Sequence, residues 1–507
     1  MLTVLLARNA FLFSAPEYED ADMGANSILI EQARRFTLLV GNYSREGFNH
    51  PGPAFLYVES WGESIFWALL HVVPTPWNGQ LVGLYLLNAG FAACVVAVVY
   101  GWTGSVRGVL AAGSVLALFG FLHPAVFNSD WMPYVYVPAF LTFVVSLASV
   151  SAGRSADAWI AALSGWFLIH GHAAFLFLVP AMVAAPVAVR AWAALRSGRG
   201  WRPALRALRA RRRVWLPVAV ISAVFVLPLI LQVALLGPGN FEAYLAYQSG
   251  GSAGGHSPAE VAGYVLWFWW PHANAWAAPL ILALAAGALL FAPAPGWRLR
   301  PGPARRFCLS LLLFDALSVV AVTGYVVVGV DSINQYYICY FSWVDPVVLV
   351  LVSVIAVAEW GRAGLAVTTA AAVAAWWAFA AAPATQLTTV YVDPENPQAG
   401  YSTDALLPAG VAAMGVVAAG RTIVLTFPHN AWPTVTGILV QAERTGVRAC
   451  VADRHWKFML TSQFICTQAQ VAGGYRMSVD PAGDQPRGVT AVARFRGAIV
   501  TAGAKMP

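Results

Sequence analysis

The chain has 507 residues, of which 59% are hydrophobic and only 10% are charged. Soluble proteins carry about 25% charged residues, so this composition excludes a large soluble enzyme. Apolar runs recur along most of the sequence, and the longer ones approach the roughly 20 residues that an α-helix needs to cross a bilayer. The net charge of +7 comes from arginines in a few short loops, which indicates membrane topology rather than nucleic-acid binding.

The first predicted element, residues 1–13, is apolar but too short to cross a membrane. We expect it to be the outer half of a first transmembrane helix. Further spans are predicted at 79–101, 108–122, 133–151, 157–170, 173–190, 214–236, 273–292, 307–329, 343–360 and 364–382. The pattern predicts a polytopic α-helical membrane protein with about eleven transmembrane helices.

Arginine placement predicts the orientation of these spans. Nine arginines lie within 190–213 and four more within 298–306. Such clusters mark cytoplasmic loops. Alternate crossing then requires that the apolar segment Trp61–Val73 does not span, and we expect it to lie in the outer interface with its polar face to water. The first external loop becomes 14–78, inside a membrane domain of residues 1–383.

Residues 384–507 are more polar and predict a small extracytoplasmic α/β domain. Cys450 and Cys466 lie within it and would pair if the domain faces an oxidising compartment. We expect helices at 402–418, 431–445 and 456–470, and strands at 421–427, 447–453, 475–479 and 489–500.

The first external loop carries an unusual acidic cluster that includes Glu19, Asp20 and Asp22, followed by a predicted helix at Asn26–Gly41. A sugar acceptor must lose its hydroxyl proton as it attacks the anomeric carbon, and a positioned carboxylate takes that proton. A phosphate leaving group needs cations rather than a protein acid. The alternative interpretation is a solvated interfacial loop, or salt bridges to Arg34, Arg35 and Arg45.

Two further motifs have the residue types of a sugar or phosphate site. His50 lies in a proline-bracketed turn, where it would bind a lipid phosphate or orient the base, or serve the turn alone. Arg45 would pair with the same phosphate. Asp130 and Trp131 adjoin in an external loop, where a ring and a carboxylate suit a sugar; the alternative is a cap for the following helix.

Three more stretches are polar at predicted external ends of helices. His172 belongs to a tight bend between two spans, which favours a cavity-facing site or simply the closing of a helical hairpin. His256 lies in a glycine- and tryptophan-rich loop, 237–272, that suits a movable cover or an interfacial anchor. Gln335 and Tyr336 have the composition of a sugar-binding edge.

The order of motifs resembles the GT-C superfamily of polyprenyl-phosphate-sugar glycosyltransferases. The resemblance covers some fifty residues and departs from the family pattern at Asn42, which replaces an acid, and at Gly52, inside the turn. The matching motifs are Arg8, Glu19-Asp20-Ala21-Asp22, Ala33-Arg34-Arg35, Gly41-Asn42-Tyr43, His50-Pro51-Gly52-Pro53 and Tyr57.

This resemblance implies an inverting enzyme with a catalytic acid in the first external loop, at Asp20 first and Asp22 next. For the donor phosphate and lipid we expect His50, Arg45, Arg34 and His256. For the sugar and acceptor we expect Glu19, Asp130, Trp131, His172, Gln335 and Tyr336. No feature of the sequence requires a metal ion or other cofactor, although a divalent metal is compatible with it.

The predicted function is transfer of a sugar from a polyprenyl-phosphate donor to an extracytoplasmic cell-envelope glycan, lipid or protein. The alanine- and arginine-rich composition indicates a high-GC bacterium, and the predicted location is its inner membrane. The alternatives are a lipid-linked-sugar flippase, for which no matched broken spans are evident, and an envelope-assembly scaffold whose external domain binds a partner.

Overall fold

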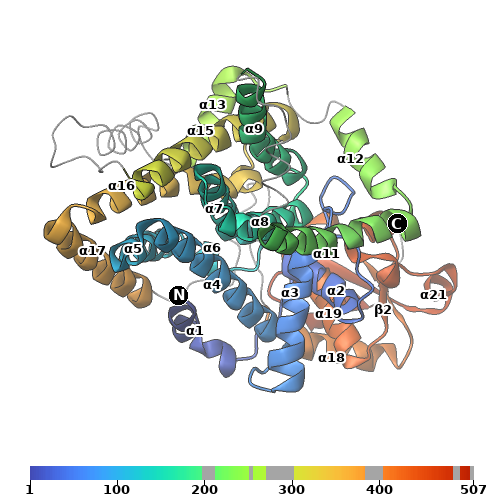
Figure 1. The fold of residues 1–507 in the computed structure, drawn as a ribbon. Helices are drawn as coiled ribbons and strands as arrows, with labels where there is room; N and C mark the ends of the chain where they lie inside the picture. The colour runs from blue at the N-terminus through green and yellow to red at the C-terminus, as the bar shows by residue number, and fades with distance from the viewer. Residues whose placement is uncertain (197–211, 250–254, 270–301, 383–403, 484–490, 503–507) are drawn as a thin grey trace. The chain divides into compact units, whose positions relative to one another are not determined.

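A computed structural model describes residues 1–196, 212–249, 255–269, 302–382, 404–483 and 491–502 (Figure 1). The chain divides into two compact units. Unit 1 consists of residues 1–8, 85–127 and 132–385, and unit 2 consists of residues 9–84, 128–131 and 386–507. The first external loop and the C-terminal region, which are far apart in the sequence, therefore belong to the same unit.

Unit 1 is helical throughout its described residues. Its main helices, one of which (α4) begins in unit 2, are α1 (Leu2–Arg8), α4 (Pro76–Thr103), α5 (Val106–Leu122), α7 (Met132–Ala152), α8 (Ala158–Gly171), α9 (Phe175–Arg196), α11 (Arg212–Leu236), α12 (Gly239–Ser249), α13 (Pro258–Trp267), α15 (Pro303–Gly329), η4 (Tyr336–Trp343), α16 (Val344–Ala358) and α17 (Gly361–Ala381). Within the described part of the chain, six helices are long and apolar enough to cross a membrane. The predicted span 273–292 lies outside the described residues, and the count of about eleven stays a prediction.

Helix α7 is the central helix of unit 1. Its most apolar stretch is 83% buried, and it packs against α8 and α15. The corresponding stretch of α11 is only 6% buried. An apolar helix surface that no protein covers is stable against lipid tails, as expected for a helix at the edge of a membrane bundle.

Unit 2 combines helices of the first external loop with a five-stranded sheet of order β2-β1-β3-β5-β4. Strand β1 is parallel to β2 and β3, whereas β5 is antiparallel to β3 and β4. The elements are α2 (Ala21–Arg34), α3 (Ala54–Gly62), the π-helix η2 (Glu63–Leu69), α18 (Leu407–Ala418), β1 (Ile423–Thr426), α19 (Trp432–Thr445), β2 (Ala449–Val451), α20 (Lys457–Leu460), α21 (Gln468–Gly473), β3 (Tyr475–Pro481), β4 (Ala491–Arg494) and β5 (Ala498–Ala502).

Three predicted elements of unit 2 were wrong in extent. The expected helix 456–470 is broken after α20, because Thr461 has φ +61°, a left-handed backbone that ends a helix. The expected strand 489–500 contains two strands, β4 and β5, that form an antiparallel pair. The helix expected to reach Gly41 ends at Arg34, and Phe36 has φ +55° just beyond it.

Helix α2 shares a hydrophobic core with the C-terminal part of the chain. Ala25 and Ile28 of α2 are buried together with Val435 and Leu439 of α19, beneath the sheet. The two helices can approach closely because Gly24 has no Cβ atom. A Cβ at this position would lie only 2.8 Å from the Thr436 hydroxyl oxygen. Burial of this shared apolar surface holds the first external loop on the C-terminal domain.

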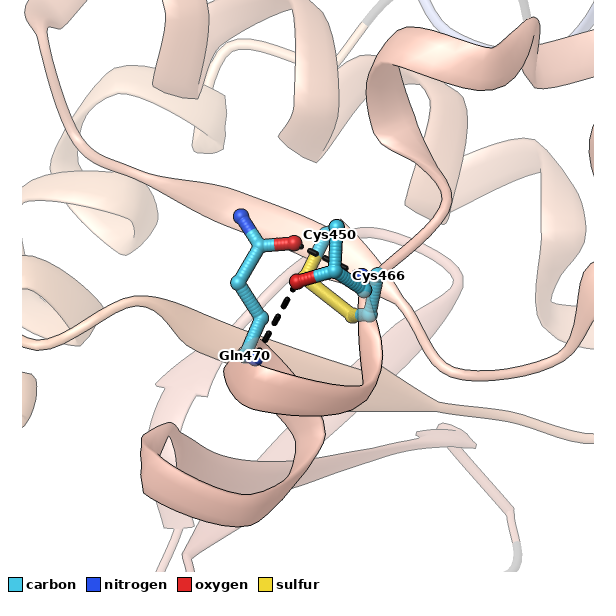
Figure 2. Close-up of a disulfide and its surroundings, with 4 residues drawn as sticks. Cys450, Cys466 and Gln470 are labelled. Atoms are coloured by element: carbon cyan, nitrogen blue, oxygen red, sulfur yellow. Dashed lines mark hydrogen bonds between the residues drawn. A yellow bond between two sulfur atoms is a disulfide. The ribbon is translucent and has the colours of Figure 1, made fainter.

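A disulfide joins Cys450 of β2 to Cys466, 16 residues later (Figure 2). Directly after Cys466, Thr467 and Gln470 cap α21 by exchanging side-chain and backbone hydrogen bonds of 2.8 and 3.2 Å. The pairing that the sequence left open is therefore present in the structure. Disulfides persist in oxidising compartments, so this bond is consistent with an extracytoplasmic domain.

Replacing both cysteines of this pair with serine should lower the stability of unit 2 by about 3 kcal/mol, the usual value for a loop of this size. Pulse proteolysis of the full chain in urea would measure the change. Adding a reductant should destabilise the native chain and leave the double variant unaffected. Cys94→Ser, at a half-buried cysteine in α4, is the control and should respond to reductant like the native chain. Equal sensitivity of the native chain and the double variant to reductant would contradict the prediction.

Candidate functional site

The acidic cluster lies at the start of α2, where the backbone is strained. Ala21, between the two aspartates, has φ +49°, which is unfavourable for a residue with a Cβ. The Thr436 hydroxyl of α19 donates a 3.0 Å hydrogen bond to the Ala21 carbonyl. Strain of this kind persists only where surrounding contacts impose it, and it is often found at functional sites.

Glu19 is fully buried and paired with a cation from the C-terminal domain. The two terminal guanidinium nitrogens of Arg444 donate hydrogen bonds to its carboxylate, at 2.7 and 3.0 Å, and Ser27 donates a further one. This partner is 425 residues away in the chain. The expected alternative partners are engaged elsewhere: Arg34 with Glu31 and Glu63, Arg35 mainly with Glu31, and Arg45 with Glu46.

Asp20 is 4% exposed and precedes α2, although its side chain does not cap the helix. Among the described residues, its Oδ1 atom has no hydrogen-bond partner. Burial raises the pKa of Asp20 well above its usual value, and the nearby negative charge of Asp404 adds to this effect. Arg496 opposes the shift. A buried carboxyl with an unused oxygen is costly unless it holds a proton or serves a ligand.

Asp22 is half-buried, and each of its carboxylate oxygens accepts a hydrogen bond from an aromatic side chain. The Tyr43 hydroxyl donates to Oδ1, and the Trp131 indole nitrogen donates to Oδ2 over 2.7 Å. Burial raises the pKa of Asp22, while these two bonds lower it. Trp131, predicted as a sugar ligand, is thus brought together with the predicted catalytic loop.

Glu59 and Glu63, at the start of the segment predicted to lie in the outer interface with its polar face to water, are both buried. Glu59 is 1% exposed and neither of its carboxylate oxygens has a partner among the described residues. Glu63 bonds Arg34 at 3.0 Å and Gln80 at 2.9 Å. The i, i+4 spacing of the two glutamates places them on one helix face, and only the fold shows that this face is the inner one.

Asp130 joins this acidic group from the short segment 128–131. The Trp77 indole nitrogen donates a 2.6 Å hydrogen bond to its carboxylate. Burial raises the pKa of Asp130 to about 7, and the Trp77 bond opposes the shift. Burial also raises the pKa of Glu59 well above its usual value, and repulsion from the Asp130 carboxylate raises it further. Several buried carboxyls of unit 2 therefore hold protons more tightly than free side chains do.

His50 and Arg45 lie near one hairpin-like turn of unit 2. His50 is buried, its backbone pairs with Asn42 and Gly41, and its ring contacts Phe48 edge-on. Arg45 is at the surface beside Glu46. The predicted roles of both residues in phosphate binding stay predictions.

The other predicted ligands belong to unit 1. His172 accepts a hydrogen bond from the Ala174 amide, and the Tyr336 ring stacks on Trp267 with centroids 4.3 Å apart. Gln335 accepts a hydrogen bond from the Tyr337 hydroxyl.

His256 bonds the Val330 carbonyl at 2.8 Å and lines an apolar groove of about 440 Å³ between α13 and α15. The groove brings one predicted donor ligand to the edge of an apolar surface. Among the described residues, no three histidine, cysteine or acidic side chains are placed to hold a metal ion.

No protein-family model matches the chain, and no curated protein matches it. Solved structures of ArnT from Cupriavidus metallidurans do match its fold. The structure bound to undecaprenyl phosphate aligns with a TM-score of 0.53 and 12% identity, over 99% of this chain and 98% of that one. The apo structure aligns with a TM-score of 0.46 and 14% identity, over 99% and 97%.

ArnT is a GT-C family glycosyltransferase, and this chain shares its fold. The resemblance inferred from the first external loop is therefore confirmed at the level of the fold, over nearly the whole chain. The alignment spans both the helical part and the C-terminal sheet of this chain.

Replacing Arg444 with Met should leave Glu19 charged, buried and unpaired, which costs about 3–5 kcal/mol. The free energy of unfolding in urea would measure this loss. Pairing the change with Glu19→Gln should recover most of the stability, because no buried charge remains. Arg35→Met removes exposed ion pairs and should cost less than about 1 kcal/mol. An equally small effect of Arg444→Met would contradict the buried pair.

Asp130 should make the stability of unit 2 depend on pH. Its pKa rises from 3.8 to about 7 in the folded protein, so folding retains a proton that the unfolded chain releases. The resulting stability is complete below about pH 4 and is lost as the pH rises through 7. Asp130→Asn should flatten this decline in unfolding measurements from pH 4 to 8. Asp453→Asn, at an exposed carboxylate, should not, and parallel curves for all three proteins would contradict the prediction.

Proposed function

We propose that this protein is a membrane glycosyltransferase that moves a sugar, with inversion, from a polyprenyl-phosphate donor to an extracytoplasmic acceptor. The observation that carries the proposal is Asp20, a buried carboxyl with an unused oxygen in a strained loop of a GT-C fold. The acceptor would be a glycan, lipid or protein of the cell envelope.

Asp20 is the proposed general base. A base works best when its pKa lies near the working pH, and burial raises the pKa of Asp20 in that direction. Asp22 is the weaker candidate, because both of its oxygens already accept hydrogen bonds that stabilise the ionised form. Its bonded position suits orienting a substrate beside the base.

The donor would be held through its phosphate and its lipid chain. Arg45, Arg34 and His50 are the proposed phosphate ligands, since cations offset the charge of the leaving polyprenyl phosphate. The apolar groove at His256 is a suitable surface for part of a prenyl chain. ArnT, the protein of similar fold, has been solved with undecaprenyl phosphate bound, which supports a lipid donor of this class.

The sugar and acceptor would contact the remaining polar and aromatic side chains. Asp130 and Trp131 in unit 2 are proposed for this role, as are His172, Gln335 and Tyr336 in unit 1. Glu19 has its carboxylate fully engaged by Arg444, so its contribution would be to position the loop. The proposed location of the protein is a bacterial inner membrane. The disulfide supports an extracytoplasmic position of the C-terminal domain.

The base assignment is tested by comparing Asp20→Asn with Asp22→Asn in purified full-length protein. Release of polyprenyl phosphate from a panel of polyprenyl-phosphate sugars, with envelope extract as acceptor, would be measured. Asp20→Asn should lower the rate by about 10²–10⁴-fold, the usual contribution of a general base. Asp22→Asn should retain more activity, and Glu359→Gln, at an exposed carboxylate of unit 1, should retain all of it.

Unchanged transfer by Asp20→Asn together with loss in Asp22→Asn would move the base to Asp22. Normal transfer by both variants would overturn the assignment of the base to this loop. Absence of transfer by the native protein from every donor of the panel would overturn the enzymatic proposal and favour a flippase or a scaffold, which need no base.

A further inference from the structure

A continuous group of rings covers one end of the sheet in unit 2. Phe427 and His429 follow β1 and contact Trp456, with ring centroids 5.1 and 5.4 Å apart. His455 and Trp456 both contact Phe458, at 5.8 and 6.3 Å. We call this group, with Tyr43, the aromatic surface: Tyr43, Phe427, His429, His455, Trp456 and Phe458.

The aromatic surface lies at the carboxyl ends of two adjacent parallel strands. Phe427 and His429 belong to the loop after β1, and His455 and Trp456 to the loop after β2. Loops at this edge of an α/β sheet diverge and leave room for a ligand, which is where such sheets bind their ligands.

Much of the aromatic surface is open to solvent and its edge is basic. The rings of His429 and His455 are exposed, and those of Phe427 and Phe458 are half-buried. Trp456 is buried. Arg454 and Lys457 are exposed beside it. The one acid in this loop, Asp453, accepts a 2.8 Å hydrogen bond from the His455 amide. The local charge therefore favours an anionic ligand.

Tyr43 connects the aromatic surface to the proposed catalytic loop. Its ring packs edge-on against Phe458, with centroids 5.9 Å apart, and its hydroxyl donates to Asp22. Helix α20, which carries Phe458, also contacts α2. A chain lying along the rings would therefore end at Asp22, two residues from the proposed base.

The turn beside the aromatic surface is strained. Thr461, directly after α20, has φ +61° and ψ 172°, a conformation that is rare for a β-branched residue. Its hydroxyl oxygen is buried and has no hydrogen-bond partner among the described residues. Strain held in place next to a solvent-open group of rings points to a ligand site.

We propose that the aromatic surface binds an acidic glycan and presents its end to the Asp20–Asp22 segment. The inference rests on the proposed function, of which it specifies the acceptor. Sugar C–H groups carry partial positive charge and pack on the negative faces of aromatic rings. Arg454, Lys457 and the two histidines would pair with carboxylate or phosphate groups along the glycan.

Binding of defined oligosaccharides to the full-length protein tests this inference without an activity assay. The probes are hexagalacturonate, which is acidic, and maltohexaose, which is neutral. Hexagalacturonate should bind more tightly, and its affinity should fall with added salt because exposed charges are screened. Phe458→Ala and Arg454→Ala should each weaken its binding by about tenfold or more.

Two matched variants separate this inference from the proposed function. Arg421 lies at the opposite edge of the sheet, over the Tyr475 ring at 4.6 Å, so Arg421→Ala should bind hexagalacturonate normally. Tyr43→Phe keeps the ring but removes the hydroxyl that bonds Asp22. It should retain glycan binding and transfer sugar more slowly. Binding that responds to Phe458 and Arg454 would support the aromatic surface even if Asp20→Asn left transfer unchanged.

Failure of both probes to bind, or equal binding by the native protein and the Phe458 and Arg454 variants, would overturn the inference. Binding of phosphatidylglycerol vesicles that depends on Arg454, with no binding of hexagalacturonate, would assign the surface to the membrane and overturn it as well.

Discussion

The buried ion pair between Glu19 and Arg444 is the contact on which the proposed active site depends. It joins the first external loop to a helix more than four hundred residues later, and both terminal guanidinium nitrogens of Arg444 donate to Glu19. A buried pair of this kind gains little net stability, but breaking it is costly, so it specifies position strongly. Thr436 adds a hydrogen bond to the strained Ala21 backbone from the same helix. The loop for which we propose the catalytic role is thus shaped by the C-terminal domain.

Other buried carboxyls of unit 2 lack a full complement of hydrogen-bond partners within the described part of the chain. Asp20 has one oxygen without such a partner, and Glu59 has two. In a low-dielectric interior such groups bind protons more tightly, which raises the pKa values of Asp20 and Glu59. The same burial that costs stability therefore prepares a carboxyl for acid–base chemistry, and the shared core of α2 and α19 offsets the cost.

The aromatic surface gives the same unit a second proposed role, which is recognition of the acceptor. Aromatic rings and cations collect where two parallel strands end, and Tyr43 links them to Asp22 through one hydroxyl. A domain that both shapes the proposed catalytic loop and holds the acceptor would couple acceptor binding to the position of the base, since α2 contacts both α19 and α20 within one unit.

Composition and periodicity determined the membrane class and most helix positions, because these features repeat along the chain. The order of motifs in the first external loop carried the GT-C resemblance, and it made Asp20 and Asp22 the candidates for the base. The sequence also offered Cys450 and Cys466 as a possible disulfide pair. Only the tertiary structure showed that Glu19 pairs with Arg444, that Glu59 faces inward, and that Trp131 bonds Asp22. These contacts join residues distant in sequence, and neither spacing nor propensity carries information on which surfaces meet when the chain closes on itself.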